Sequence, residues 1–98
     1  MLKCSGYRVE PAEIEHCINQ LAGIAQCAVV GIKDSTSGQR PAALVVLNAE
    51  ASLGDTIKPL RQLLPAYMQP YKFLSVEKLP VLSNGKTDYQ TIEKLFKA

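Results

Sequence analysis

Two apolar runs rich in valine and isoleucine lie close together in the sequence, one from Ile24 to Ile32 and the other from Ala42 to Leu47. A short polar segment with turn-forming residues, 33–41, separates them. Apolar runs of this length, bounded by turn residues, are typical of β-strands, and a short link between two strands favours antiparallel pairing. The chain is therefore expected to fold around an antiparallel pair of strands.

A helix is predicted just before the first run, from Pro11 to Leu21. Pro11 suits the first helical position, where a missing N–H breaks no hydrogen bond. Gly23 is expected to end the helix through a left-handed backbone conformation. The apolar residues that recur at helical spacing are Ile14, Cys17, Ile18 and Leu21.

The rest of the chain alternates short apolar segments with prolines and other turn residues. A second helix is expected between Asp55 and Leu64, with Pro59 in its first turn or with its start shifted toward Lys58. The other expected elements are an extended stretch over 3–9, a turn over 66–69, a third strand over 72–76 and a final helix over 89–96. Together they predict an α+β fold, a small sheet of about three strands, mainly antiparallel, with helices packed on it.

Length and charge limit the class of protein. A chain of 98 residues with 47% hydrophobic content can form one domain, 1–98, with a modest core. Its formal net charge is +2, and the basic residues are dispersed from Lys3 to Lys97. Nucleic-acid binding is therefore not expected, because it depends on clustered lysine and arginine.

The sequence also predicts neither a metal site nor a membrane segment. Its three cysteines, Cys4, Cys17 and Cys27, lack the close C-x-x-C spacing of zinc and redox sites, and are expected to act as small buried apolar residues. No stretch approaches the roughly 20 apolar residues that span a bilayer, and the first residues lack the apolar core of a secretion signal. A cytoplasmic location without a membrane partner is expected.

One candidate functional segment runs from Ser83 to Asp88. Asn84 and Gly85 favour a tight turn with a positive φ, which projects the next side chain outward. That side chain is Lys86, a flexible cation that can reach phosphate or carboxylate oxygens as charge builds up in a displacement at phosphorus. Taken alone, such a segment is more often an exposed turn with a solvated lysine than a catalytic element.

A second candidate segment leads from Gly6 into the first helix. Gly6 permits close approach of a ligand to the backbone, and Arg8 can pair with a carboxylate or a phosphate. The acidic residues that follow, Glu10, Glu13 and Glu15, are by themselves more often partners of the helix dipole or solvated surface than acid or base catalysts. Neither segment identifies a function alone.

Together and in this order, the two segments resemble the signature of the acyl- and aminoacyl-adenylate-forming superfamily, which includes acyl-CoA synthetases, adenylation domains of non-ribosomal peptide synthetases, and luciferases. Residues 6–15 resemble the glycine-arginine motif that follows the family's interdomain hinge, and residues 79–88 resemble its terminal lysine motif. The resemblance continues between them and spans essentially the whole chain. Residues 28–34, 38–46 and 64–70 follow the strand, strand and helix-exit patterns of the family's small subdomain.

The resemblance implies that this chain is the mobile C-terminal subdomain of an AMP-forming ligase. Such an enzyme uses ATP and Mg to activate a carboxylic or amino acid as an acyl-adenylate, and then transfers the acyl group to the pantetheine thiol of CoA or of an acyl or peptidyl carrier protein. By resemblance, Lys86 bridges the substrate carboxylate and the α-phosphate in the first step, on the turn made by Asn84 and Gly85. In the second step the subdomain has rotated, and another loop lines the pantetheine channel. The residues implied there are Gly6, Tyr7, Arg8 and Glu10.

The resemblance also implies what this chain does not contain. The large N-terminal adenylation domain, which binds most of the ATP and the acid, has no counterpart in these 98 residues, so the isolated chain is not expected to be active. Tyr89 follows Asp88 where many relatives place arginine, and this departure leaves the subfamily open. The alternative is a separately encoded, non-catalytic interaction module that binds a carrier or partner protein, in which Lys86 has no catalytic role.

Overall fold

The computed structural model describes residues 2–4, 7–34 and 38–97. Within these residues lie five strands, four α-helices and one 3-10 helix. The strands are β1 (Leu2–Cys4), β2 (Tyr7–Val9), β3 (Ile24–Asp34), β4 (Gly38–Leu47) and β5 (Lys72–Ser75). The helices are α1 (Pro11–Asn19), α2 (Leu53–Ile57), α3 (Leu60–Leu63), the 3-10 helix η1 (Ala66–Met68) and α4 (Tyr89–Lys97).

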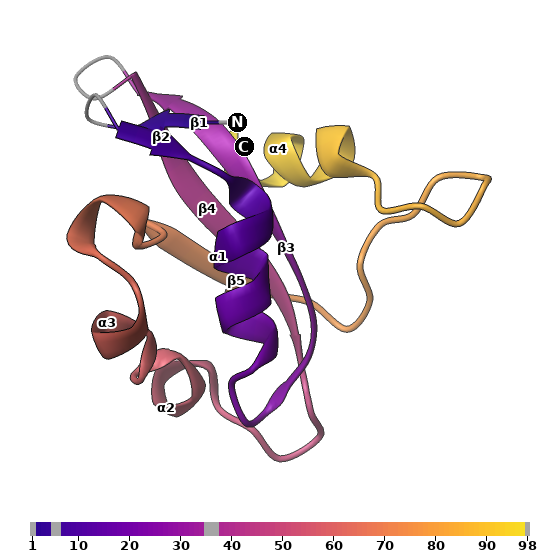
Figure 1. Ribbon diagram of the computed structural model, residues 1–98. Helices are drawn as coiled ribbons and strands as arrows, with labels where there is room; N and C mark the ends of the chain where they lie inside the picture. Colours follow the sequence, from indigo (N-terminus) through magenta and orange to yellow (C-terminus); the bar gives the residue numbers. More distant parts are fainter. Residues whose placement is uncertain (1, 5–6, 35–37, 98) are drawn as a thin grey trace.

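Strand β4 lies at the centre of the sheet (Figure 1). Strand β3 pairs with it antiparallel along its whole length, from Ile24 opposite Leu47 to Asp34 opposite Gly38. On the other side of β4, β1 pairs antiparallel at one end and β5 pairs parallel further along. Strand β2 pairs only through β1, which gives the order β2-β1-β4-β3 with β5 beside β4.

Two hydrophobic clusters cover the two faces of this sheet. Because side chains alternate along a strand, Val29 faces one cluster while its neighbours Ala28 and Val30 face the other. Helices α1 and α3 pack on the first face, and α4 packs on the second. Each fully buried Ile, Leu or Val side chain contributes roughly 1.5–3 kcal/mol by leaving water. The largest such side chains are Ile14, Ile18, Leu44, Leu60, Ile92, Val9, Val29 and Val45.

The α+β class and the mainly antiparallel sheet are confirmed, including the pairing of the two apolar runs. Strands β3, β4 and β5 correspond to the about three that the sequence predicts, and the extended stretch over 3–9 adds the short pair β1 and β2. Strands β3 and β4 run past the apolar residues because their backbone ladder continues through polar pairs such as Lys33 opposite Gln39. Helices α1 and α4, the proline-bracketed turn at η1 and strand β5 lie within two residues of their predicted bounds.

A single helix from Asp55 to Leu64 is wrong, whereas the alternative start near Lys58 lies close to the observed helix α3 and misses α2. The structure has two short helices there, α2 and α3, with Pro59 at the N-terminal cap of the second. A continuous helix would need an N–H at Pro59 and would press its ring against the carbonyl of Asp55. The break therefore follows from Pro59, and α2 begins two residues earlier than expected because Ser52 caps it by accepting a hydrogen bond from the Asp55 amide.

Gly23 sets the turn between α1 and β3. Its φ is +98°, and a Cβ there would lie 2.9 Å from the Thr56 hydroxyl oxygen and 3.0 Å from the Ala51 Cβ. Thr56 is itself buried, with a relative exposure of 7%. The left-handed conformation expected at Gly23 is confirmed, but it does not end the helix, because α1 ends at Asn19 with Gln20 as a right-handed C-cap. Close packing against the α2 region adds a second reason for glycine at this position.

The variant Gly23→Ala is therefore expected to lower the free energy of unfolding by about 1–3 kcal/mol, because it combines backbone strain with a steric clash. Urea denaturation of the chain measures this. The matched control is Gly54→Ala in α2, where a Cβ meets nothing within 4 Å, and it is expected to be neutral or stabilising by up to about 1 kcal/mol. Equal stabilities of the two variants would contradict this account of Gly23.

Candidate functional site

The segment 81–87, just before α4, forms a hairpin that projects from the body of the protein (Figure 1), and Lys86 lies near its tip by its hydrogen bonds. Val81 and Thr87 form an antiparallel bridge across it. Nearer the tip, the Leu82 amide donates to the Lys86 carbonyl at 2.7 Å, and the Gly85 amide donates to the Leu82 carbonyl at 2.9 Å. This pattern is that of a three-residue hairpin loop, a tight turn followed by one left-handed residue.

The left-handed residue is Gly85, with a φ of +86°. The carboxamide oxygen of Asn84 accepts a hydrogen bond of 3.0 Å from the Lys86 amide, as asparagine commonly does two residues ahead of itself in a turn. The turn predicted at Asn84 and Gly85 is thus confirmed, and the backbone of Lys86 is held on both its N–H and its C=O.

The Lys86 side chain is exposed, as are all its neighbours from Val81 to Gly85. Within residues 2–4, 7–34 and 38–97, no ion pair or side-chain hydrogen bond engages its ammonium group. A rigid backbone therefore presents a flexible, uncommitted cation at the edge of the molecule. Such a group can follow and stabilise a developing negative charge on an oxygen.

Asp88 joins the hairpin to helix α4. Its amide donates to the Pro80 carbonyl at 2.9 Å and closes the base of the hairpin. Its carboxylate accepts bonds from the Thr91 hydroxyl at 2.7 Å and the Thr91 amide at 3.2 Å, which caps the helix. The bond from the Thr91 hydroxyl, and to a smaller extent the bond from the Thr91 amide, hold the pKa of the Asp88 carboxyl below its usual value.

Glu15 of α1 lies where three elements meet. Its oxygen Oε1 accepts a bond of 2.9 Å from the Val29 amide of β3 and another of 2.9 Å from the Tyr89 hydroxyl at the start of α4. Partial burial of the phenol, then the bond to Glu15 and its negative charge, raise the pKa of Tyr89 to about 12. Tyr89 is therefore a neutral hydrogen-bond donor at physiological pH.

Cys27 lies beside the same glutamate. Its thiol is 3.5 Å from the Glu15 carbonyl oxygen, and burial together with the Glu15 charge raises the pKa of Cys27 to about 12. The thiol stays protonated at neutral pH and is a poor nucleophile. Cys17 and Cys27 are both half-buried against the core, as expected for small apolar residues, while the side chain of Cys4 lies outside the described part.

The glycine-led segment lies elsewhere in the fold. Gly6 lies outside the described residues, and Tyr7 and Arg8 belong to β2, where they pair with β1. The side chains of Arg8 and Glu10 are exposed, and Glu10 occupies the N-terminal cap of α1 without a capping side-chain bond. Figure 1 places β2 and the Lys86 hairpin on opposite sides of the molecule. The structure therefore does not bring the two candidate segments together.

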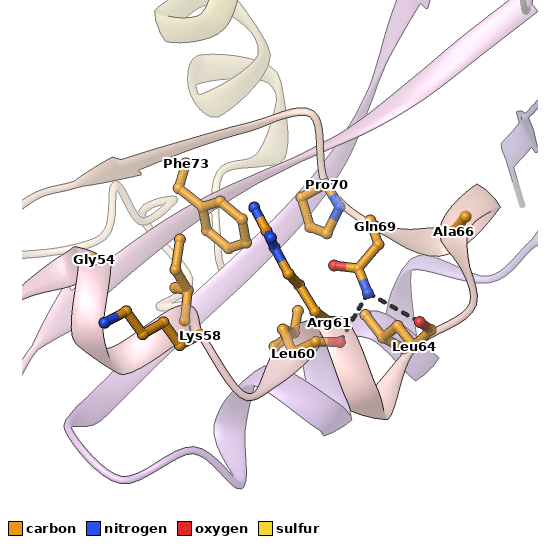
Figure 2. A pocket seen from close by; sticks show the side chains of 10 residues that line it. Gly54, Lys58, Leu60, Arg61, Leu64, Ala66, Gln69, Pro70 and Phe73 are labelled. Carbon is orange, nitrogen blue, oxygen red and sulfur yellow. Dashed lines mark hydrogen bonds between the residues drawn. The ribbon is translucent and has the colours of Figure 1, made fainter.

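Sequence reasoning missed a pocket of about 880 Å³ between α2, α3, η1 and the start of β5 (Figure 2). Its walls are mainly apolar, with Leu60, Leu64 and Phe73 among them. The Arg61 side chain extends across it, and the Gln69 amide closes one side by donating to the carbonyls of Leu60 and Leu64 at 2.7 and 2.9 Å. Among the described residues that line it, none is an acid, thiol or imidazole, and its ionisable side chains are the cations Lys58 and Arg61.

The sequence signal for this pocket is the spacing of Pro59, Pro65 and Pro70. Each proline interrupts regular structure, so the segment folds as short pieces around a hollow instead of one helix packed flat on the sheet.

In the described ranges, no group of three or more His, Cys, Asp or Glu side chains is placed to hold a metal ion. No helix in this part of the chain has the length and apolar character needed to cross a membrane.

Comparison with known proteins identifies relatives of the chain. Residues 13–86 match the family model of the AMP-binding enzyme C-terminal domain. The chain is 34% identical over 91 residues to bacitracin synthase 3 of Bacillus licheniformis, a match that covers 93% of this chain and 1% of that protein. It is 37% identical over 93 residues to tyrocidine synthase 2 of Brevibacillus parabrevis, covering 95% of this chain and 3% of that one.

Solved structures show the same fold within larger enzymes. A fatty acyl CoA synthetase of Mycobacterium tuberculosis superimposes with a TM-score of 0.85 and 30% identity, over 98% of this chain and 19% of that one. ATP-bound MatB from Rhodopseudomonas palustris superimposes with a TM-score of 0.90 and 25% identity, over 99% and 20%. The chain thus spans only a small part of the length of each of these relatives.

The hairpin geometry makes a prediction for Gly85→Ala. Nothing lies within 4 Å of a Cβ at this position, so the substitution introduces left-handed strain alone. That strain is about 1–2 kcal/mol, and hydrogen exchange at the Leu82 amide is expected to accelerate about tenfold with little change in global stability. Lys86→Ala is the control and should leave the exchange rate unchanged. Unaltered exchange in Gly85→Ala would show that the loop does not depend on its glycine.

The raised pKa values of Cys27 and Tyr89 predict the response to alkali. Both groups lose their protons in the unfolded chain near 9.0 and 10.0 but stay protonated in the fold up to about 12. The unfolded state therefore binds fewer protons than the folded state between about pH 9 and pH 12. The stability that these two groups contribute is fully present below about pH 9 and is lost as the pH rises toward about 12. Urea denaturation at pH 8 and pH 10.5 should show a smaller loss in Cys27→Ala than in the original chain. An equal loss of stability between pH 8 and pH 10.5 in Cys27→Ala and in the original chain would show that Cys27 does not contribute to this pH dependence.

Proposed function

The chain belongs to the family of AMP-binding enzyme C-terminal domains, and we propose that residues 1–98 act as the mobile C-terminal subdomain of an AMP-forming acid–thiol ligase. In the complete protein the subdomain supplies Lys86 to an active site built mainly by a large N-terminal adenylation domain. The reaction activates a carboxylic or amino acid with ATP as an acyl-adenylate and releases pyrophosphate. The acyl group then passes to the pantetheine thiol of CoA or of a carrier protein.

The observation that carries this proposal is the placement of Lys86 on a rigid, projecting hairpin with its ammonium group uncommitted. Attack of a carboxylate on the α-phosphate of ATP brings together two anionic groups. A cation placed between them offsets their repulsion and stabilises the negative charge of the transition state. A hairpin fixed at its base and exposed at its tip can reach into a neighbouring domain without disturbing its own core.

ATP and Mg are proposed to bind mainly to the N-terminal domain. Lys86 and Arg8 are exposed cations on this chain, and their charges suit phosphate oxygens. Bound Mg would neutralise phosphate charge during the displacement. This chain contributes the lysine and the rotation that brings the lysine in.

For the second step, Gly6, Tyr7, Arg8 and Glu10 are proposed to line the pantetheine channel. Strand β2 lies on the side of the molecule away from the hairpin of residues 81–87, which supports separate roles for the two segments in the two steps. Because the two segments lie on different faces, one rotation of the subdomain withdraws the lysine and presents the other segment to the active site. Arg8 and Glu10 are exposed in this segment, where an incoming thiol arm could contact them.

The test uses the complete gene product and pyrophosphate release from ATP with a panel of carboxylic and amino acids. Lys86→Ala is expected to lower the rate by about 100-fold or more, the range seen on removing one charge partner of a transition state. The control is Lys78→Ala, another exposed lysine of this chain that lies outside the turn, and it should retain the original rate.

Equal rates for Lys86→Ala and Lys78→Ala would overturn the proposal. The non-catalytic interaction module would then be favoured, since the open pocket with Lys58 and Arg61 at its lining is suited to a partner with acidic side chains. Binding of a carrier protein to the 98-residue chain would be the next measurement in that case.

A further inference from the structure

The hairpin that carries Lys86 is tied to the opposite layer of the protein by one side chain. Tyr89 is the first residue of α4, and its hydroxyl donates a hydrogen bond of 2.9 Å to Glu15 of α1. The two residues are 74 positions apart in the chain, and their helices cover different faces of the sheet. The bond therefore bridges the two layers.

The acceptor at the other end of this bond is itself fixed. The same oxygen of Glu15 accepts the Val29 amide at 2.9 Å, and Glu15 is half-buried. Within the described strands, β3 pairs only with β4, so this amide belongs to the open edge of the sheet. Glu15 thus accepts a hydrogen bond from a backbone N–H at the edge of the sheet. This bond to the Val29 amide holds the Glu15 oxygen in place, so the oxygen cannot readily follow a displaced Tyr89 hydroxyl.

Without Tyr89, the start of α4 would be held less firmly. The core contacts of this nine-residue helix come from Ile92 and Phe96, which begin a turn further along. Tyr89 is 44% exposed as a residue, so apolar burial alone anchors it weakly. Asp88 caps the first turn through Thr91 and closes the hairpin base on Pro80, and buried Leu79 anchors the other end of the hairpin, but these contacts lie on the side of the sheet that α4 covers. The hydroxyl bond to Glu15 is the side-chain contact that ties this first turn to α1 on the other side.

We infer that Tyr89 is a positioning residue for Lys86. Its hydroxyl, held by Glu15, fixes the start of α4 and so sets the direction in which the hairpin presents the lysine. This inference rests on the proposed function, because the direction of the hairpin matters only where Lys86 must meet a developing charge. A small change in the angle between the hairpin and α4 displaces the Lys86 ammonium group more than it displaces the hairpin base. Misplacement of a catalytic group by about 1 Å can lower a rate by about two orders of magnitude.

The test compares Tyr89→Phe with Tyr71→Phe in the complete gene product. Tyr71 is a matched control, since it is 38% exposed and its ring stacks with Arg40, a contact that phenylalanine retains. Tyr89→Phe is expected to lower kcat for pyrophosphate release roughly five- to tenfold with an unchanged KM for ATP, the pattern of an interaction realised in the transition state. Tyr71→Phe should leave both constants unchanged.

Two further measurements separate positioning from a general loss of structure. Transfer of the acyl group from a supplied acyl-adenylate to CoA or a carrier protein should proceed at the original rate in Tyr89→Phe, because Lys86 is withdrawn in that step. In a Glu15→Ala background, Tyr89→Phe should have no additional effect on pyrophosphate release, since the two side chains act through one bond. Equal losses in both half-reactions, or additive losses in the double variant, would overturn the inference.

The outcomes also separate this inference from the proposed function. If Lys86→Ala itself has no effect on pyrophosphate release, the proposed function fails and the positioning role fails with it. If Lys86→Ala lowers the rate by about 100-fold while Tyr89→Phe matches Tyr71→Phe, the proposed function stands and the positioning role alone is wrong.

Discussion

The antiparallel ladder between β3 and β4 is the constraint on which the rest of the structure depends. It joins the strands from Ile24 opposite Leu47 to Asp34 opposite Gly38, and both faces of the pair are covered by apolar side chains. Strands β1 and β5 attach to this pair through β4, and β2 attaches through β1. The main helices pack on the pair through the alternating side chains of its two faces. A one-residue slip would turn Val29 and Ala43 to the wrong cluster, so the register is fixed by burial on both sides.

The core is separate from the groups proposed to do chemistry. Lys86 sits on a hairpin whose residues from Val81 to Lys86 are exposed, and its backbone is organised by local bonds at Leu82, Asn84 and Gly85. The hairpin thus depends on the core only through its base, where Leu79 is buried on one side and Asp88 and Tyr89 lead into α4 on the other. This separation suits a side chain that must enter another domain and then leave it.

Local patterns in the sequence were sufficient for much of this architecture. Helical spacing located α1 and α4, the two apolar runs located β3 and β4, and Asn84 with Gly85 located the turn. Each of these signals depends on residues close together in the chain. The division into α2 and α3 could also have been predicted locally, because the ring of Pro59 removes a backbone N–H and blocks a continuous helix.

Other features depend on contacts between distant residues and have no local signal. The bond from Tyr89 to Glu15 joins residues 74 positions apart, and the pocket beside Arg61 arises from how three short pieces close around one another. Even the second reason for glycine at Gly23, its contact with Thr56, comes from a helix more than thirty residues away. Periodicity predicts which elements form, whereas these contacts depend on how the elements pack.

A positive charge at position 86 of this hairpin is proposed to drive adenylation. The most direct measurement is chemical rescue of Lys86→Cys in the complete gene product, with aminoethylation of the thiol to rebuild a lysine-like ammonium group and the original protein treated in parallel. The account predicts that Lys86→Cys releases pyrophosphate slowly and that aminoethylation restores most of the lost rate. A variant that stays slow after complete modification, while the treated original protein stays active, would contradict it.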